Sequence, residues 1–221
     1  MPLWIPGPIM SSTARSFALT ASPIETVDGT TTTFSAQDFG PAGSSRIMVA
    51  AFGEGPVTSA PAITSVTIGG VAATLINGVL STSERVAIYA AAVPTGTSGD
   101  VVIVWTQSCD AVGLNLYSMI GYSITPTDSG TSTTAGGGTF DLDIAAGGVA
   151  IGFQVSRNNT DVTHTWAGLI EDTDDVLTAG AYQASGASGS FATTQTNLTC
   201  SCTPSASNIR TAFVVASFPP A

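Results

Sequence analysis

His164 is the one histidine in the chain, so any mechanism that depends on an imidazole must use it. In the alternating segment Val162-Thr163-His164-Thr165-Trp166 its side chain is expected on the same strand face as Val162 and Trp166. Neither a Gly-x-Ser-x-Gly elbow nor a second histidine accompanies it, although a hydrolase triad or a zinc site would normally need such groups. The sequence therefore favours a structural histidine, and we predict no catalytic residue and no metal ligand.

The run Glu171-Asp172-Thr173-Asp174-Asp175 is the densest charge in the chain. Calcium needs several oxygens that converge on one point, but the run lacks the spaced acids and central glycine of an EF-hand loop. We expect a solvated turn between strands. Asp141 and Asp143 alternate with apolar residues, which predicts the wet face of a strand. Paired acids also serve glycoside hydrolysis, but nothing marks a cleft for them, so we predict no enzyme and no cofactor.

Cys109, Cys200 and Cys202 make an odd count, which leaves at least one free thiol and argues against a disulfide framework. In Cys200-Ser201-Cys202 both sulfurs lie on one strand face, where a bridge between them would be strained. The default for each is a small buried apolar side chain. A bridge from Cys109 to Cys200 or Cys202 remains open, because these residues end corresponding strands of two similar halves.

The aromatic residues allow two interpretations. Within alternating strands they are most simply core, whereas exposed aromatics in a row would form a platform for stacking sugars. The sequence does not separate the two interpretations for Trp105, Tyr117, Tyr122, Phe153, Trp166, Phe213 and Phe218.

The elements that carry these residues are predicted to be strands, because short alternating segments are separated by Gly, Ser, Pro and Asp clusters. No stretch has a convincing helical period. The clearest hairpin is 63–76, in which Gly69-Gly70 supplies a two-residue turn. The predicted strands are 15–21, 30–36, 45–53, 62–68, 71–76, 84–93, 99–107, 112–123, 139–144, 148–156, 161–170, 177–184, 189–200 and 209–218.

Charge is scarce. Charged residues make up 9% of the 221, with no lysine and a net charge of -10, whereas soluble domains average about 25%. Five dispersed arginines form no basic stripe, so we predict no nucleic-acid partner. The apolar runs are far below the roughly 18 residues of a membrane span, and the N-terminus lacks the basic start of a secretory signal. We therefore expect neither a membrane partner nor export.

Residues 1–14 are predicted to be an extended arm, because prolines remove backbone donors and favour extended geometry. Large apolar side chains on such an arm would be costly to leave in water. We expect the arm to pack on the protein itself or on a neighbouring subunit, with partner contacts at Trp4, Ile5, Pro6, Pro8 and Ile9.

Two halves, about 15–125 and 139–221, show the same order of elements. A Ser/Thr/Gly-rich segment from Pro126 to Gly138, too polar to fold alone, joins them. They could be tandem domains or one sandwich in which each half supplies strands to both sheets. We favour one antiparallel β-sandwich over 15–221, jelly-roll-like, because either half alone would bury little apolar surface.

The proline-rich N-terminus, the Thr/Ser/Gly/Ala-rich strands, the near absence of lysine, the Ser65–Ala72 hairpin and the strand Val86-Ala87-Ile88-Tyr89-Ala90 resemble β-sandwich virion proteins of tailed bacteriophages. These include head decoration proteins and tail or fibre components.

The resemblance implies a structural protein made in the host cytoplasm, located in the virion and docked through its arm. We expect a capsid decoration or cement protein that contacts the major capsid protein and forms a homo-oligomer, with a trimer favoured. The alternatives are a tail or fibre component and a glycan-binding module that uses exposed aromatics and the acidic turn.

Overall fold

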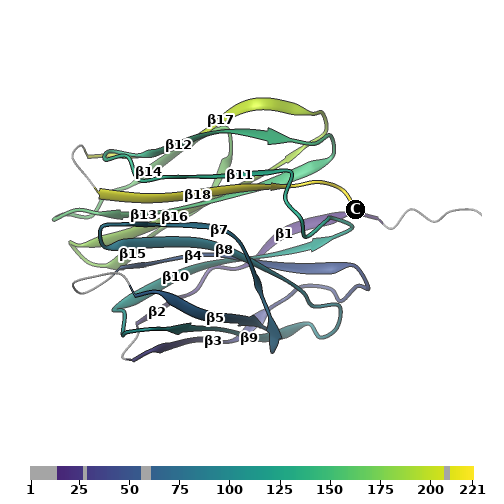
Figure 1. The fold of residues 1–221 in the computed structure, drawn as a ribbon, viewed down its shortest axis with the longest axis horizontal. Helices are drawn as coiled ribbons and strands as arrows, with labels where there is room; N and C mark the ends of the chain where they lie inside the picture. The colour runs from purple at the N-terminus through teal and green to yellow at the C-terminus, as the bar shows by residue number, and fades with distance from the viewer. Residues whose placement is uncertain (1–13, 27–28, 56–60, 207–209) are drawn as a thin grey trace, which may run out of the picture.

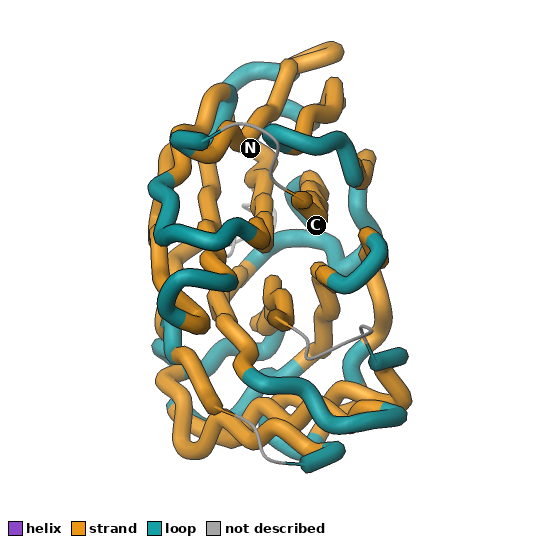
Figure 2. Tube along the Cα trace, turned by 90° about the vertical axis from the view of Figure 1, so that its left-hand side faces the viewer, coloured by secondary structure: helices purple, strands orange, loops and turns teal. Residues whose placement is uncertain are grey.

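The structure is a computed structural model that describes residues 14–26, 29–55, 61–206 and 210–221. All regular secondary structure in these ranges is strand (Figures 1 and 2). The strands pair antiparallel throughout, so the all-β antiparallel prediction is confirmed. Within the described ranges no helix is long and apolar enough to cross a lipid bilayer.

The first half of the chain forms two sheets. Its inner sheet has the order β1 (Ser16–Ala21), β10 (Ala111–Ile120), β4 (Arg46–Gly55), β8 (Glu84–Ala92) and β7 (Thr74–Ser81), and β2 (Ile24–Thr26) also pairs with β10. Its outer sheet has the order β3 (Thr31–Asp38), β9 (Ser98–Trp105), β5 (Ile63–Ile68) and β6 (Val71–Ala72).

The second half repeats this arrangement. Its inner sheet has the order β11 (Asp128–Ser132), β18 (Arg210–Phe218), β13 (Gly148–Arg157), β16 (Tyr182–Phe191) and β15 (Ile170–Thr178). Its outer sheet has the order β12 (Gly138–Ile144), β17 (Gln195–Pro204) and β14 (His164–Ala167). When β2 and β6 are left out, each half has eight strands, and the strands that correspond in chain order occupy corresponding places in the two sheets.

The four sheets stack as layers (Figure 1). The two inner sheets pack face to face, with β4 against β13, β8 against β18 and β7 against β11. A central core lies between them, and a separate core lies between each inner sheet and its outer sheet. Strands β4, β10, β13 and β18 are therefore buried on both faces, which explains apolar runs such as 47–52 and 212–216.

Each sheet takes all its strands from one half. The favoured single sandwich, in which each half supplies strands to both sheets, is therefore wrong. Strands that are close in the chain pair through short connections. The two halves pack against each other through their inner sheets, and this joint buries apolar side chains of both halves in one central core.

Three segments differ from prediction. The connector 126–138 contains β11, because β18 supplies its backbone partners from Asp128↔Ser217 to Ser132↔Phe213. The expected turn at Glu171–Asp175 is part of β15, paired along β16. The predicted strand 161–170 is shorter, because Gly168 has φ +82°, a conformation that interrupts the strand before β15 begins.

Residues 185–188, which separate the predicted strands 177–184 and 189–200, lie inside β16. Their small side chains fit a crowded layer: a Cβ on Gly186 would lie 2.1 Å from Asn115 Nδ2. The Gly69-Gly70 turn of the predicted hairpin 63–76 is confirmed, but its second strand is shorter than predicted: only Val71–Ala72 pair with β5, and the chain from Thr74 onward belongs to β7 of the inner sheet. Both glycines have positive φ, at 59° and 76°, and Ile68 pairs with Val71 across the turn.

Candidate functional site

His164 lies at the start of β14 in the outer sheet of the second half, and its ring contacts two strands of the inner sheet. Its Nδ1 is 2.6 Å from Asp174 Oδ1 on β15, and its Nε2 is 2.9 Å from Ser156 Oγ on β13. The backbone N–H of His164 also donates to Asp174 Oδ2, at 2.9 Å. An ionised carboxylate only accepts hydrogen bonds, so Nδ1 is the donor to Asp174, and Nε2 shares the second hydrogen bond with the Ser156 hydroxyl.

This Ser156–His164–Asp174 chain has the same order of groups as a nucleophilic triad. Its surroundings differ, because Ser156 is 0% exposed and its hydroxyl also accepts from Gln154 Nε2 at 3.2 Å. The His164 side chain is also 0% exposed. A substrate carbonyl therefore has no approach to Ser156 Oγ, and the chain instead ties the outer sheet of the second half to its inner sheet.

Sequence reasoning considered His164 but missed both of its partners. Ser156 is one of many serines in small-residue strands, and Asp174 belongs to the run that was expected to be a turn. No local pattern marked these partners. Asp172 and Asp174 are two residues apart, yet Asp172 contacts Tyr117 of the first half and Asp174 contacts His164 of the outer sheet, because the register of β15 shifts between Glu171 and Thr173.

Asp172 makes the equivalent tie between the two halves. Its Oδ2 accepts from the hydroxyl of Tyr117 on β10 at 2.8 Å. Beside it, Asn115 Nδ2 donates to Thr173 Oγ1 at 3.0 Å. Burial raises the pKa of the Asp172 carboxyl and raises that of the Tyr117 phenol well above its ordinary value. The acidic run thus supplies partly exposed hydrogen-bond acceptors at two joints.

The remaining acidic candidates lie on the surface. Asp141 and Asp143 are exposed on β12, as expected, and accept hydrogen bonds from Thr199 Oγ1 and from the backbone N–H of Asn197, both at 2.7 Å. In the part of the chain that the structure describes, no three His, Cys, Asp or Glu side chains gather closely enough to hold a metal ion.

The three cysteines are free and buried. Cys109 lies in the outer core of the first half, and Cys200 and Cys202 lie in the outer core of the second half. The bridge that the sequence left open therefore does not form, because two inner sheets separate the thiols. Burial raises the pKa of Cys109 to about 12 and that of Cys200 to about 11, and it raises that of Cys202 further. None is a reactive thiolate at neutral pH.

The aromatic side chains considered for sugar stacking are core residues, with one half-buried exception. Trp166 is partly exposed, and its Nε1 donates to Ser185 Oγ at 2.7 Å. The large apolar side chains that are exposed in the described ranges are all aliphatic: Ile24, Val71, Leu75, Leu80, Ile170 and Val176. The buried aromatics are Trp105, Tyr117, Tyr122, Phe153, Phe213 and Phe218.

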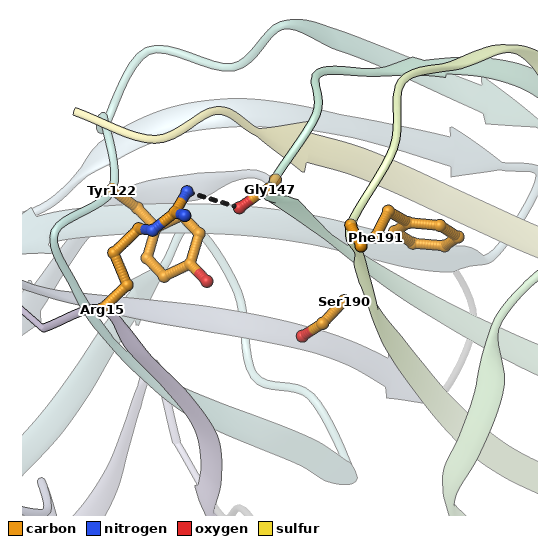
Figure 3. Close-up of a pocket in the computed structure, with 7 residues that line it drawn as sticks. Arg15, Tyr122, Gly147, Ser190 and Phe191 are labelled. Carbon is orange, nitrogen blue, oxygen red and sulfur yellow. Dashed lines mark hydrogen bonds between the residues drawn. The ribbon is translucent and has the colours of Figure 1, made fainter.

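An open pocket of about 500 Å³ lies where the two halves meet, at the end of the molecule that holds the C-terminus (Figures 1 and 3). Figure 3 shows Arg15 reaching across it, with Ser190 and Phe191 on the other side. Arg15 Nη1 donates to the carbonyl oxygen of Gly147 at 3.1 Å. The pocket lining contains no carboxylate and no nucleophile paired with a base, so it offers a contact surface rather than catalytic groups.

The inner sheets end at β1 and β7 in the first half and at β11 and β15 in the second, and the equivalent edges β7 and β15 differ in charge. In the first half, β7 pairs with β8 on one side only, carries no charged residue, and exposes Leu75 and Leu80 by 52% and 43%. In the second half, β15 exposes Ile170 and Val176 but also carries four acidic residues. Charges discourage strands from pairing edge to edge, so β7 is the unguarded edge of the two.

The expected partner contacts Trp4, Ile5, Pro6, Pro8 and Ile9 lie outside the residues that the structure describes. Comparisons of the chain with protein-family models, with curated proteins and with solved structures gave no match.

Proposed function

We propose that the chain is a non-enzymatic structural protein of a tailed-phage virion, attached to the outside of the head as a decoration or cement protein. In this proposal each half is a jelly-roll-like β-sandwich, and the partners are the major capsid protein and further copies of the chain, with a trimer favoured. The side chains of Ser156, His164 and Asp172 support a structural role, because each forms a hydrogen bond between two layers of the fold.

The observation that carries the proposal is the edge strand β7. Its outer row of backbone donors and acceptors has no strand partner among the described residues, since β7 is the last strand of its sheet there. Leu75 and Leu80 add apolar surface, and the segment Thr74–Ser81 contains no charge to repel a neighbour. A free monomer would usually guard such an edge. In an assembly, a neighbouring subunit would cover it.

The native mass of the purified protein and its binding to particles assembled without it test the proposal. We expect an oligomer that binds these particles, and L75K should weaken both properties because it places a charge on the β7 edge. I170K is the matched control, since it makes the same change at an exposed residue of the other edge. A wild-type protein that is monomeric and does not bind the particles would overturn the proposal.

Antibody labelling distinguishes a position on the head from a position on the tail or fibre. Antibody labelling of virions should decorate the faceted head if the chain is a cement protein. Labelling confined to the tail would replace the decoration role by the tail or fibre alternative, while the structural class would stand.

A further inference from the structure

Two arginines lie side by side at the end of the molecule opposite the C-terminus. Arg157 ends β13 and Arg210 begins β18, and the two residues are direct partners in the strand register. Direct partners in an antiparallel pair project from the same face, and like charges placed this way repel each other. Both follow the alternation of the central core, after Val155 and before Ala212, so both cap the joint between the halves.

Most N–H donors of the Arg157 and Arg210 guanidiniums have no acceptor among the described residues. Each guanidinium has five N–H donors, yet within the described ranges each makes one side-chain hydrogen bond, a long 3.4 Å contact to the hydroxyl of Ser83. The Ser83 hydroxyl itself donates to Glu84 Oε1 at 2.7 Å. No carboxylate of the described residues forms an ion pair with either arginine, since the one salt bridge found there joins His164 and Asp174.

Arg46 is buried, unlike the partly buried Arg157 and the exposed Arg210, and its guanidinium is fully hydrogen-bonded. Arg46 is 1% exposed and donates to six backbone carbonyl oxygens, those of Phe39, Gly40, Pro41, Val93, Thr95 and Gly96. Its charge is met by carbonyl dipoles of two connecting segments, 39–41 and 93–96. Arg157 and Arg210 have no comparable set of acceptors among the described residues, so their donors are open to a bound ligand.

A small polar pocket forms around the arginine pair. It has a volume of about 180 Å³ and is lined by Arg157, Asn158, Asn159 and Arg210. Arg157 is held in place by the ring of Tyr182, whose centroid lies 5.5 Å from the guanidinium carbon. The two guanidiniums lie on adjacent strands and Asn159 follows β13, so their side chains can offer hydrogen-bond donors to one bound group, whereas Asn158 Nδ2 already donates to Thr160 Oγ1 at 3.1 Å.

We propose that this pocket binds one small oxyanion, a phosphate or sulfate group, which bridges Arg157 and Arg210. An oxyanion with several oxygens accepts from both guanidiniums at once and removes their mutual repulsion. The net charge of -10 disfavours an extended polyanion, so the occupant is a single group. Because the arginines reach Ser83 in the other half, the bound anion would also strengthen the joint between the halves.

Calorimetric titration with inorganic phosphate, at constant ionic strength set with chloride, tests this site. We expect saturable one-to-one binding that R210Q weakens by about tenfold or more. R15Q is the matched control, because it removes the same charge from the opposite end of the molecule and should bind like the wild type. Wild-type protein that takes up no phosphate, or equal affinities in R210Q and R15Q, would overturn the proposal.

The thermal midpoint gives a second measurement that does not depend on heats of binding. Phosphate should raise the midpoint of the wild type and of R15Q, and it should raise that of R210Q much less. A sugar phosphate in place of inorganic phosphate distinguishes the source of the anion: tighter binding indicates a phosphate carried by a larger ligand, and equal binding indicates the free ion. An equal rise in all three proteins would show general salt stabilisation and contradict the site.

Discussion

Glu54 is a fully buried carboxyl group on β4, and neither of its oxygens has a hydrogen-bond partner among the described residues. Burial raises its pKa from 4.5 to about 8; Arg85 opposes this shift, and Glu84 and Asp110 add to it. The folded protein thus holds a proton on Glu54 that the unfolded chain releases above pH 4.5. Deprotonation within the fold would leave a buried charge beside an apolar core.

Stability should therefore depend on pH. Between pH 4.5 and about 8 the native state binds more protons at Glu54 than the unfolded state, so the free energy of unfolding falls as pH rises. We expect a loss on the order of a few kcal/mol, measured by urea unfolding from pH 5 to 9. E54Q should flatten this slope and be the more stable protein at pH 9. Identical slopes would refute the assignment.

The free energy of unfolding of E54Q should still fall somewhat as pH rises. Burial also raises the pKa values of Glu171, Asp172 and Asp175 on β15, which gives their contributions the same sign. The comparison between wild type and E54Q isolates the part that belongs to Glu54.

The hydrogen bonds of His164 predict a second residue-scale effect. H164A leaves the Ser156 hydroxyl and the Asp174 carboxylate without their shared partner, and losses of this kind cost about 2–4 kcal/mol. Chemical denaturation measures it, with T165A as the control, since Thr165 is the exposed neighbour on the same strand. The structural role would be refuted if the two variants were equally stable.

At the scale of elements, the same physics shows what the sequence could and could not reveal. The turn at Gly69-Gly70 could be predicted, because its two residues and the strand residues that pair across it are neighbours in the sequence. The middle of β16 could not be predicted as strand, because the small residues around Gly186 are typical of a turn and are held as a strand only by pairing with β13 and β15. Likewise, the Asp174 partner of His164 lies on a different strand, and no local pattern links them.

The close packing of β16 against β10 can be tested with a double-mutant cycle. G186A should place a Cβ 2.1 Å from Asn115 Nδ2, which displaces that amide from Thr173 and costs about 1–3 kcal/mol. In an N115A background the clash partner is gone, so G186A should cost clearly less. Additive effects of the two substitutions would show that the strands do not meet as described.

For the whole molecule, the joint between the inner sheets decides how unfolding proceeds. Gly53 on β4 faces the other half so closely that a Cβ would lie 2.3 Å from Val155 Cγ2 on β13. Within its own half, the same Cβ would lie 3.0 Å from the carbonyl oxygen of Arg85. Because the two inner sheets share one core, loosening the joint should expose both halves together. The halves are similar in topology but not independent in stability.

Hydrogen exchange checks this coupling. G53A should lower amide protection in β10 and β13 together, by about 1–3 kcal/mol in opening free energy. G43A is the control, because the nearest atom there is the flexible Cδ1 of Ile120 at 3.2 Å. Loss of protection in one half alone would show that the halves open separately.

The order of the chain also gives the molecule two distinct poles. At one pole Ser16 pairs with Ile120, and the backbone N–H of Ala221 donates to the carbonyl oxygen of Gly121, so the two ends of the described chain leave side by side. Arg157 and Arg210 lie at the other pole. A surface, bead or fused protein attached at Ala221 would therefore lie at one pole and leave the arginine pole facing away from it.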